Sequence, residues 1–239
     1  MQCWTFDVRE LMDGSVFEEA MARLPWDQRR QKARRFVFQK DRCLSLGAGL
    51  LAAYVLLRAG ATDLSLGEGP YGKPYLTHCH DVQFSLSHSG WLVACAVSGE
   101  PVGVDVEELH EYDADVAKMV FCEAELAWLR EQPDPGHAFT RLWVRKESLL
   151  KLMGTGLTDD LRAYDVSPKA SAAPADALPP AVDAPAPSFA GPADAPTPNN
   201  GGDVRFWEHA CDGCLLAVCT RGDARVSLHR AEPGFWRVS

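Results

Sequence analysis

Three short apolar runs, connected by small polar turns, constrain the fold more than any other feature of the sequence. Each run is five or six residues long and rich in Val, Leu and Ala, and each connector contains the Ser, Gly or Pro residues of tight turns. The runs are Val82–Leu86, Leu92–Val97 and Val102–Val106. We therefore expect an antiparallel meander of consecutive strands here.

Helical patterns lie on both sides of these strands. Arg29–Arg58 predicts a basic entry and a long helix, with Leu46, Leu50, Ala53, Tyr54 and Leu57 on one face. Further helices are predicted over 114–120, 123–131 and 137–153, and Gly154-Thr-Gly156 provides a C-cap for the last one. The helices are expected to pack on the sheet.

The order strand, helix, strand, strand occurs before Glu107 and again, with variation, after it. This predicts an α+β fold of two similar α/β halves packed as a pseudo-dimer, with residues 1–106 in the first half and 107–239 in the second. Residues 168–202 are dominated by Ala, Pro, Asp and Ser and predict a disordered insert. A hairpin with Asp212-Gly213 at its turn is expected after the insert.

Charge and composition exclude several classes of protein. A net charge of −9 argues against nucleic-acid binding and against a membrane surface. The N-terminus lacks the pattern of a signal peptide, and the longest apolar stretch is too short to span a bilayer, so a cytoplasmic protein is expected. The eight scattered cysteines are interpreted as buried reduced thiols, including those of the His209-x-Cys211-x-x-Cys214 group.

The segment Val102-Gly-Val-Asp-Val-Glu107 places two carboxylates on one patch. Because strand side chains alternate between faces, Asp105 and Glu107 project together while Val104 and Val106 face the core. Hard oxygen ligands of this kind suit Mg²⁺. The alternative is a solvated strand end.

A helical segment adds an acid and a base. Within Trp143-Val-Arg-Lys-Glu-Ser-Leu-Leu-Lys151, Glu147 and Lys151 are one turn apart and share a face. A surface salt bridge is the alternative interpretation.

Anion-binding candidates come from two further segments. Phe84-Ser-Leu-Ser-His-Ser-Gly90 runs into a small-residue turn that can hold a phosphate, unless it is an ordinary hairpin turn. Basic residues that can hold a polyphosphate are Arg29, Arg30, Lys32, Arg34, Arg35 and Lys73, with solvated charge as the alternative for each.

Taken in order, these blocks resemble the 4′-phosphopantetheinyl transferase superfamily, in its monomeric Sfp-like type. The resemblance covers most of the chain except the 168–202 insert, and the matching blocks are Gly72-Lys-Pro74, Phe84–Gly90, Val102–Glu107 and Trp143–Lys151. It implies a Mg²⁺-dependent enzyme, with Mn²⁺ as an alternative ion. This enzyme moves the 4′-phosphopantetheine arm of coenzyme A to a serine of an apo acyl or peptidyl carrier protein and releases 3′,5′-ADP.

The resemblance also implies roles for particular residues. Asp105, Glu107 and Glu147 would bind the metal, and Glu147 and Lys151 would be catalytic. Coenzyme A would be held by Arg29, Lys32, Ser45, Lys73, Ser87, His88 and Lys151. The implied activity is that of a holo-[acyl-carrier-protein] synthase serving fatty-acid, polyketide or nonribosomal peptide biosynthesis as a monomer.

Two other functions use the same residues. One is a Mg²⁺-dependent hydrolase of a nucleotide pyrophosphate, and the other is a non-catalytic carrier-protein binder. Glu107-Glu-Leu-His110 lacks the basic residue that many relatives carry after the acidic motif. The carrier is expected to dock on Phe121–Leu129 together with Met119.

Overall fold

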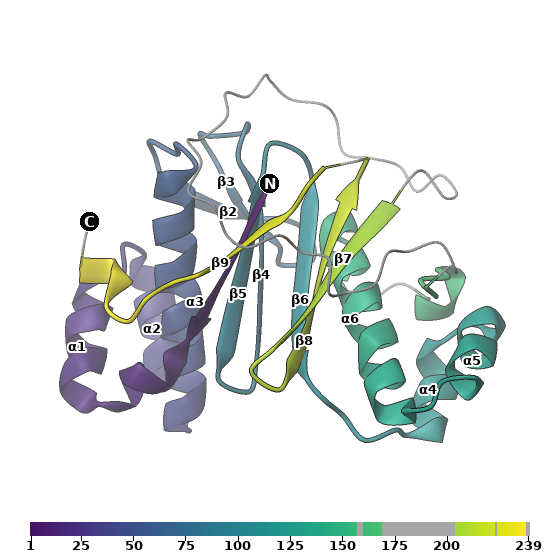
Figure 1. Cartoon of the computed structure of the whole chain (residues 1–239). Helices are drawn as coiled ribbons and strands as arrows, with labels where there is room; N and C mark the ends of the chain where they lie inside the picture. Colours follow the sequence, from purple (N-terminus) through teal and green to yellow (C-terminus); the bar gives the residue numbers. More distant parts are fainter. Residues whose placement is uncertain (157–159, 169–203, 223, 238–239) are drawn as a thin grey trace.

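Two β-sheets lie face to face between two groups of helices in the computed structural model, which describes residues 1–156, 160–168, 204–222 and 224–237. Helix α3 packs on one sheet with α1 and α2 beside it, and α6 packs on the other sheet with α4 and α5 on its outer side (Figure 1). The order is therefore helix, sheet, sheet, helix. This confirms the mixed α+β class, while internal twofold symmetry between the halves stays a prediction.

The first sheet has the strand order β4-β5-β1-β9. Its strands are β4 (Gln83–Ser89), β5 (Leu92–Ser98), β1 (Gln2–Asp7) and β9 (Ser227–Arg230). In β5, Val93, Cys95 and Val97 pack against the helices, whereas Leu92, Ala94 and Ala96 pack against the second sheet. Burial on both faces explains the unbroken apolar run of β5.

The second sheet has the order β6-β8-β7 and is antiparallel throughout. Its strands are β6 (Val102–Glu108), β8 (Cys214–Arg221) and β7 (Val204–Cys211). Val102, Val104 and Val106 lie in the core between the sheets. Asp212 and Gly213 have φ values of 50° and 78°, which confirms the predicted hairpin and its turn.

Six α-helices, three 3-10 helices and a separate pair of strands complete the described elements. The helices are α1 (Gly14–Arg23), α2 (Asp27–Arg35), α3 (Gln39–Arg58), α4 (Ala114–Val120), α5 (Glu123–Arg130) and α6 (Pro135–Met153). The 3-10 helices are η1 (Val8–Met12), η3 (Leu161–Ala163) and η5 (Phe235–Arg237), and the strand pair is β2 (Leu66–Glu68) and β3 (Pro74–Leu76). Gly154 has φ 73° and ends α6 as a left-handed cap, as predicted.

The predicted three-stranded meander is wrong in its last strand. The β4–β5 hairpin forms, but β6 leaves this sheet and pairs with β8, which is more than a hundred residues further along the chain. The turn also differs, because β4 continues to Ser89 and leaves only Gly90 and Trp91 between the strands. Residues 87–89 are therefore strand and not turn.

Residues from the end of the second predicted half pack within the first predicted half. The predicted boundary after residue 106 falls inside β6, while β9 pairs in parallel with β1. Phe235 and Trp236 pack in the core under α1–α3. The predicted insert 168–202 lies outside the described residues apart from Pro168.

Two smaller expectations have clear outcomes. All eight cysteines are free, but only five are buried, since Cys79, Cys122 and Cys211 are partly exposed. Cys211 and Cys214 face each other across the β7–β8 turn. Leu57, expected on the buried face of its helix, is 48% exposed at the end of α3. In the described ranges, no helix is long and apolar enough to cross a membrane.

Candidate functional site

Strands β4 and β6 lie side by side, although they belong to different sheets, and serine hydroxyls connect them. Ser85, Ser87 and Ser89 alternate along β4 and project toward β6. Ser85 Oγ accepts a hydrogen bond from Val104 N at 3.1 Å, and Ser89 Oγ accepts one from Glu108 N at 3.1 Å. The two sheets are thus joined by side-chain bonds at the strand that carries the candidate metal ligands.

The same serines hold the carboxylates. Ser87 Oγ donates to Asp105 Oδ1 at 2.7 Å, and Ser89 Oγ donates to Glu107 Oε2 at 2.6 Å. The prediction that both carboxylates project from one face of β6 is confirmed, because Val104 and Val106 are fully buried on the other face. The contacts of Ser85 and Ser89 with β6 were not predicted, although the period-two spacing of these serines with Ser87 is typical of a strand.

Helix α6 packs directly on this face of β6, and Gly103 makes the close approach possible. A Cβ at residue 103 would overlap the carbonyl oxygen of Ser148 and lie 2.5 Å from Leu152 N. The helix backbone therefore rests on the strand backbone. This contact brings Glu147 and Lys151, on the facing turns of α6, next to Asp105. The structural need for Gly103 was not predicted.

Asp105 is the most buried of the candidate residues, at 2% exposure. Its Oδ1 accepts from Lys151 Nζ at 2.6 Å as well as from Ser87, whereas its buried Oδ2 has no hydrogen-bond partner. Burial raises the pKa of Asp105, and the Lys151 ammonium opposes that shift. A buried oxygen without a donor is costly and is suited to a cation ligand.

Glu147 is close enough to Asp105, Glu107 and Lys151 for their charges to change its pKa. Burial, followed by repulsion from Asp105 and Glu107, raises the pKa of Glu147 to about 6, against an opposing effect of Lys151. Glu107 also lies 3.5 Å from His110 Nε2. Carboxylates that repel one another around an orphaned oxygen fit a hard divalent ion such as Mg²⁺.

The three carboxylates are near one another but are not gathered around one point. Among the described residues, only Cys122, Glu125 and Asp165 form a set of ligand atoms that all lie within 4.8 Å of one another. In that set, Glu125 already pairs with the buried Lys146 at 2.8 Å and accepts from Cys122 N and Val166 N. Those contacts account for Glu125 as a structural residue.

The predicted coenzyme A residues are placed unevenly. Lys73 Nζ donates to the carbonyls of Lys151 and Val102 at 2.5 and 3.1 Å, and burial lowers its pKa to about 8. It thus contacts the last turn of α6 and not the carboxylates. Ser87 is hydrogen-bonded to Asp105 and Lys151, while His88, the next residue of β4, is exposed.

The other predicted coenzyme A residues, Arg29, Lys32 and Ser45, lie on α2 and α3, and the electrostatic environment of His88 shows which of them is near the site. Desolvation lowers the pKa of His88, and the nearby Lys151 and Lys32 ammoniums lower it further, which places Lys32 in its neighbourhood. Burial lowers the pKa of Arg29, whose guanidinium lies 5.7 Å from the Trp26 ring. Ser45 is half-buried on α3. Of Arg29, Lys32, Ser45 and His88, only His88 and Lys32 thus lie near the carboxylates of the candidate site.

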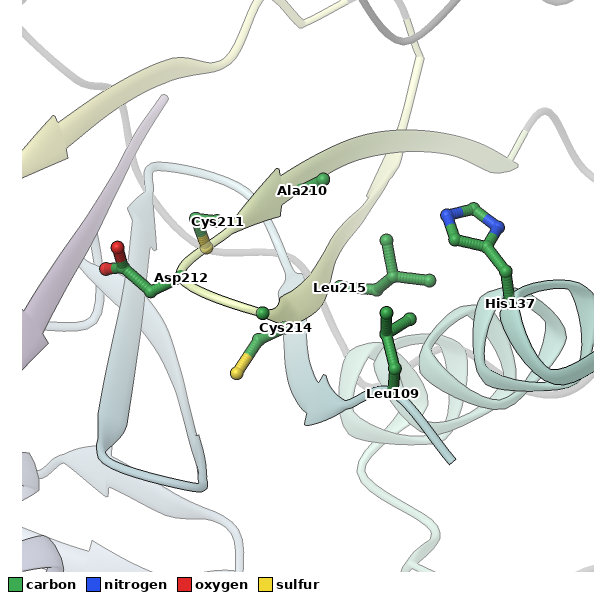
Figure 2. A pocket seen from close by; sticks show the side chains of 8 residues that line it. Leu109, His137, Ala210, Cys211, Asp212, Cys214 and Leu215 are labelled. Carbon is green, nitrogen blue, oxygen red and sulfur yellow. The ribbon is translucent and has the colours of Figure 1, made fainter. Parts of the chain in front are cut away.

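A hollow of about 220 Å³ lies beyond the end of β6, around the β7–β8 turn (Figure 2). Leu109, His137 and Leu215 are on one side of it, and Cys211, Asp212 and Cys214 are on the other. None of the predicted catalytic, metal or coenzyme A residues lines this hollow. The candidate site is therefore the β4, β6 and α6 cluster.

The expected docking segment is partly exposed. Phe121, Leu126 and Leu129 are 1%, 7% and 3% exposed, because they pack with α6 in the core of the second helical group. The outer side of α5 is open at Glu123, Ala124 and Ala127, and Met119 is 74% exposed. Docking of a carrier on Phe121–Leu129 with Met119 stays a prediction.

Comparisons with known proteins identify the family. The model of the 4′-phosphopantetheinyl transferase superfamily matches residues 101–184, which include β6 and α6. A Bacillus subtilis 4′-phosphopantetheinyl transferase is 35% identical over 147 residues, covering 59% of this chain and 66% of that protein. The transferase Sfp of Bacillus subtilis strain 168 is 31% identical over 144 residues, covering 58% of this chain and 64% of Sfp.

A more distant organism provides a third relative. The L-aminoadipate-semialdehyde dehydrogenase-phosphopantetheinyl transferase of Saccharomyces cerevisiae is 31% identical over 169 residues, covering 65% of this chain and 62% of the yeast protein. The chain thus spans just under two thirds of the length of these relatives. Together with the matched acidic strand and helix, these similarities show that the chain belongs to the 4′-phosphopantetheinyl transferase superfamily.

Proposed function

We propose that this chain transfers the 4′-phosphopantetheine arm of coenzyme A to a serine of an apo acyl or peptidyl carrier protein. The observation that carries the proposal is the orphaned, buried Oδ2 of Asp105 beside Lys151 and Glu147. Family membership supports the same reaction. The holo-[acyl-carrier-protein] synthase type belongs to this proposal and not to the established family assignment.

Asp105, Glu107 and Glu147 would hold Mg²⁺, which when bound offsets the negative charge of the coenzyme A pyrophosphate. The residues of the chain would orient the ligands, accept the serine proton and neutralise the leaving group. Ser87 and Ser89 orient two of the carboxylates by the hydrogen bonds described above. Positioning and charge neutralisation are the main sources of catalysis in phosphoryl transfer.

Glu147 is suited to take the proton of the carrier serine. With a pKa of about 6 it is mostly ionised at neutral pH and yet basic enough to accept a proton. The serine oxygen then bonds to the phosphorus that bears the pantetheine arm. The bond from this phosphorus to the bridging oxygen breaks, and 3′,5′-ADP leaves.

Lys151 is suited to neutralise the leaving group. Its ammonium is bonded to Asp105 and Ser87 in this structure and is 30% exposed on the side chain, so it lies at the open side of the cluster. A cation there stabilises the negative charge that grows on the bridging oxygen as it becomes part of the 5′-phosphate of the leaving 3′,5′-ADP. All these residues come from one chain, which is consistent with a monomeric enzyme.

Mass spectrometry tests the proposal. The protein is incubated with coenzyme A, Mg²⁺ and several unrelated apo carriers, and each carrier is weighed. We expect a carrier to gain one phosphopantetheine and 3′,5′-ADP to be released. Cleavage of coenzyme A with every carrier unchanged would identify a hydrolase, and no change in either would identify a non-catalytic binder.

A further inference from the structure

The Lys73 ammonium lies at the C-terminal end of α6, next to three main-chain carbonyls. Its Nζ is 2.5 Å from the carbonyl oxygen of Lys151, 3.1 Å from that of Val102 and 3.5 Å from that of Leu152. A lysine ammonium has three N–H donors, and here three carbonyls lie within hydrogen-bond distance. The donors of Lys73 are thus used by the main chain.

The last carbonyls of α6 need a donor from outside the helix, because the final turn of an α-helix leaves them without a partner. Gly154 N donates to the carbonyl of Leu150 at 2.8 Å. Lys73 serves the next two carbonyls, those of Lys151 and Leu152. These oxygens form the negative end of the helix dipole, which attracts a cation. Lys73 therefore caps α6 both by hydrogen bonds and by charge.

The turn that carries Lys73 is held on two sides. Within the β2–β3 turn, Gly69 N donates to the carbonyl of Lys73 at 2.9 Å. On the helix side, a Cβ at Gly154 would lie 3.6 Å from Lys73 Cδ, and one at Gly156 would lie 3.3 Å from Tyr71 Cβ. The turn thus packs on the cap of α6, which gives the ammonium a defined position.

Lys151 connects this cap to the candidate site. Its carbonyl accepts from Lys73, while its own ammonium donates to Asp105 Oδ1 at 2.6 Å. The remaining contact of Lys73 is with Val102, the first residue of the strand that carries Asp105. Lys73 therefore ties the last turn of α6 to the start of β6. Loss of this tie would let Lys151 shift relative to Asp105.

We propose that the side chain of Lys73 is a positioning residue for transfer, which holds Lys151 in place through the last turn of α6 and does not bind coenzyme A. The proposal rests on the proposed function and deepens it. The family resemblance implies a coenzyme A contact for this lysine instead. A phosphate would need at least one of the three donors, and its gain would be offset by an uncapped helix carbonyl.

Steady-state kinetics of Lys73→Met test the role, because methionine has a similar stem and no donor. We expect kcat for transfer to fall about tenfold or more, since a displaced Lys151 stabilises the leaving group less well. Lys73→Arg, which keeps a cation that donates to carbonyls, should recover part of this loss. Arg237→Met is the control for loss of one cation, because Arg237 pairs with the exposed Glu19 at 2.8 Å in the first helical group.

A double-mutant cycle with Lys151 tests the route of the effect. If Lys73 acts through Lys151, adding Lys73→Met to Lys151→Met should change kcat and the Kd for 3′,5′-ADP by less than about twofold. A direct ligand of coenzyme A would instead raise this Kd about tenfold in both backgrounds, and that result would overturn the proposal. Should Lys73→Met not fold, Lys73→Arg takes its place in the cycle, where its smaller effect should likewise vanish.

Hydrogen exchange gives a readout that does not depend on activity. The amides of residues 150–154 should exchange faster in Lys73→Met than in the wild-type protein, because the last turn of α6 loses its cap. Equal exchange in the two proteins would contradict the proposal.

The positioning role and the proposed function fail in different ways. If the wild-type protein modifies a carrier and Lys73→Met keeps its kcat, the positioning role is overturned and the proposed function stands. If the wild-type protein modifies no carrier, the proposed function fails, and the role of Lys73 in transfer fails with it. The exchange and 3′,5′-ADP measurements then decide whether Lys73 holds Lys151 in place.

Discussion

At the scale of single residues, Glu147 links stability to metal binding. Burial raises its pKa from 4.5 to about 6, so its contribution to stability is present below pH 4.5 and is lost as the pH rises through 6. At pH 7.5 without metal, Glu147→Gln should therefore raise the free energy of unfolding by up to about 2 kcal/mol. Chemical denaturation measures this change, and the gain should disappear at pH 4.

The same variant should lose function. Removing the proton acceptor and a metal ligand should lower the rate of transfer by at least about a hundredfold. Mg²⁺ should raise the melting temperature of the wild-type protein by binding to the folded state, and should do so less in Glu147→Gln. Equal Mg²⁺ shifts in both proteins, or wild-type transfer by the variant, would contradict the role assigned to Glu147.

Ser89 is a positioning residue, because it touches a ligand and not the reacting atoms. Its hydroxyl donates to Glu107 and accepts from Glu108 N, so Ser89→Ala frees the Glu107 side chain. We expect the Mg²⁺ concentration for half-maximal transfer to rise about tenfold or more, with partial rescue by Ser89→Thr. Ser98→Ala is the control, since that hydroxyl accepts from Glu100 N at the far end of the hairpin.

At the scale of elements, the contact between α6 and β6 depends on Gly103. An added methyl group would meet helix backbone, which cannot rotate away as a side chain can. Gly103→Ala should therefore cost about 3 kcal/mol or more of stability and reduce transfer. Urea denaturation measures the loss. Gly14→Ala, at the start of α1 where nothing lies within 4 Å, should leave stability close to that of the wild type.

The other side of α6 is held by a buried ion pair. Lys146 Nζ contacts Glu125 at 2.8 Å and donates to the carbonyls of Leu161 and Tyr164. Lys146→Met leaves Glu125 charged and buried, and should cost about 3–5 kcal/mol. The double variant Lys146→Met with Glu125→Gln should recover part of this loss in urea denaturation. No recovery would show that the backbone contacts of Lys146 dominate.

Helix α6 and the β7–β8 hairpin were predicted well, because residues close in sequence determine where a helix ends and where a hairpin turns. The spacing of apolar residues and the Gly154 cap identified α6, and Asp212-Gly213 identified the β7–β8 hairpin. Alternation along β6 also placed Asp105 and Glu107 together on one face. The pairing of β6 was missed because its partner β8 is distant in sequence, and strand patterns do not specify a partner.

The burial of Phe121, Leu126 and Leu129 was not predicted, for a similar reason. Apolar residues in Phe121–Leu129 fit either a core or a contact surface, and only the packing of α6 against them decides between the two. The hydrogen bond from Ser87 to Asp105 was not predicted, because it joins two strands of different sheets. The role of Ser87 in holding coenzyme A stays a prediction. Long-range contacts therefore limited the site prediction more than residue chemistry did.

At the scale of the whole molecule, the two sheets share one core and the chain ends close the first helical group. An isolated fragment 1–106 keeps most of β6 but lacks β7 and β8, which complete the second sheet, and lacks Phe235 and Trp236, which pack on Phe6. We expect this fragment not to fold, because the apolar surface that these parts cover stays in water. The full chain should unfold in one transition. Circular dichroism and tryptophan fluorescence during urea titration measure both, and a cooperative transition of the fragment would show instead that the first half is an independent domain.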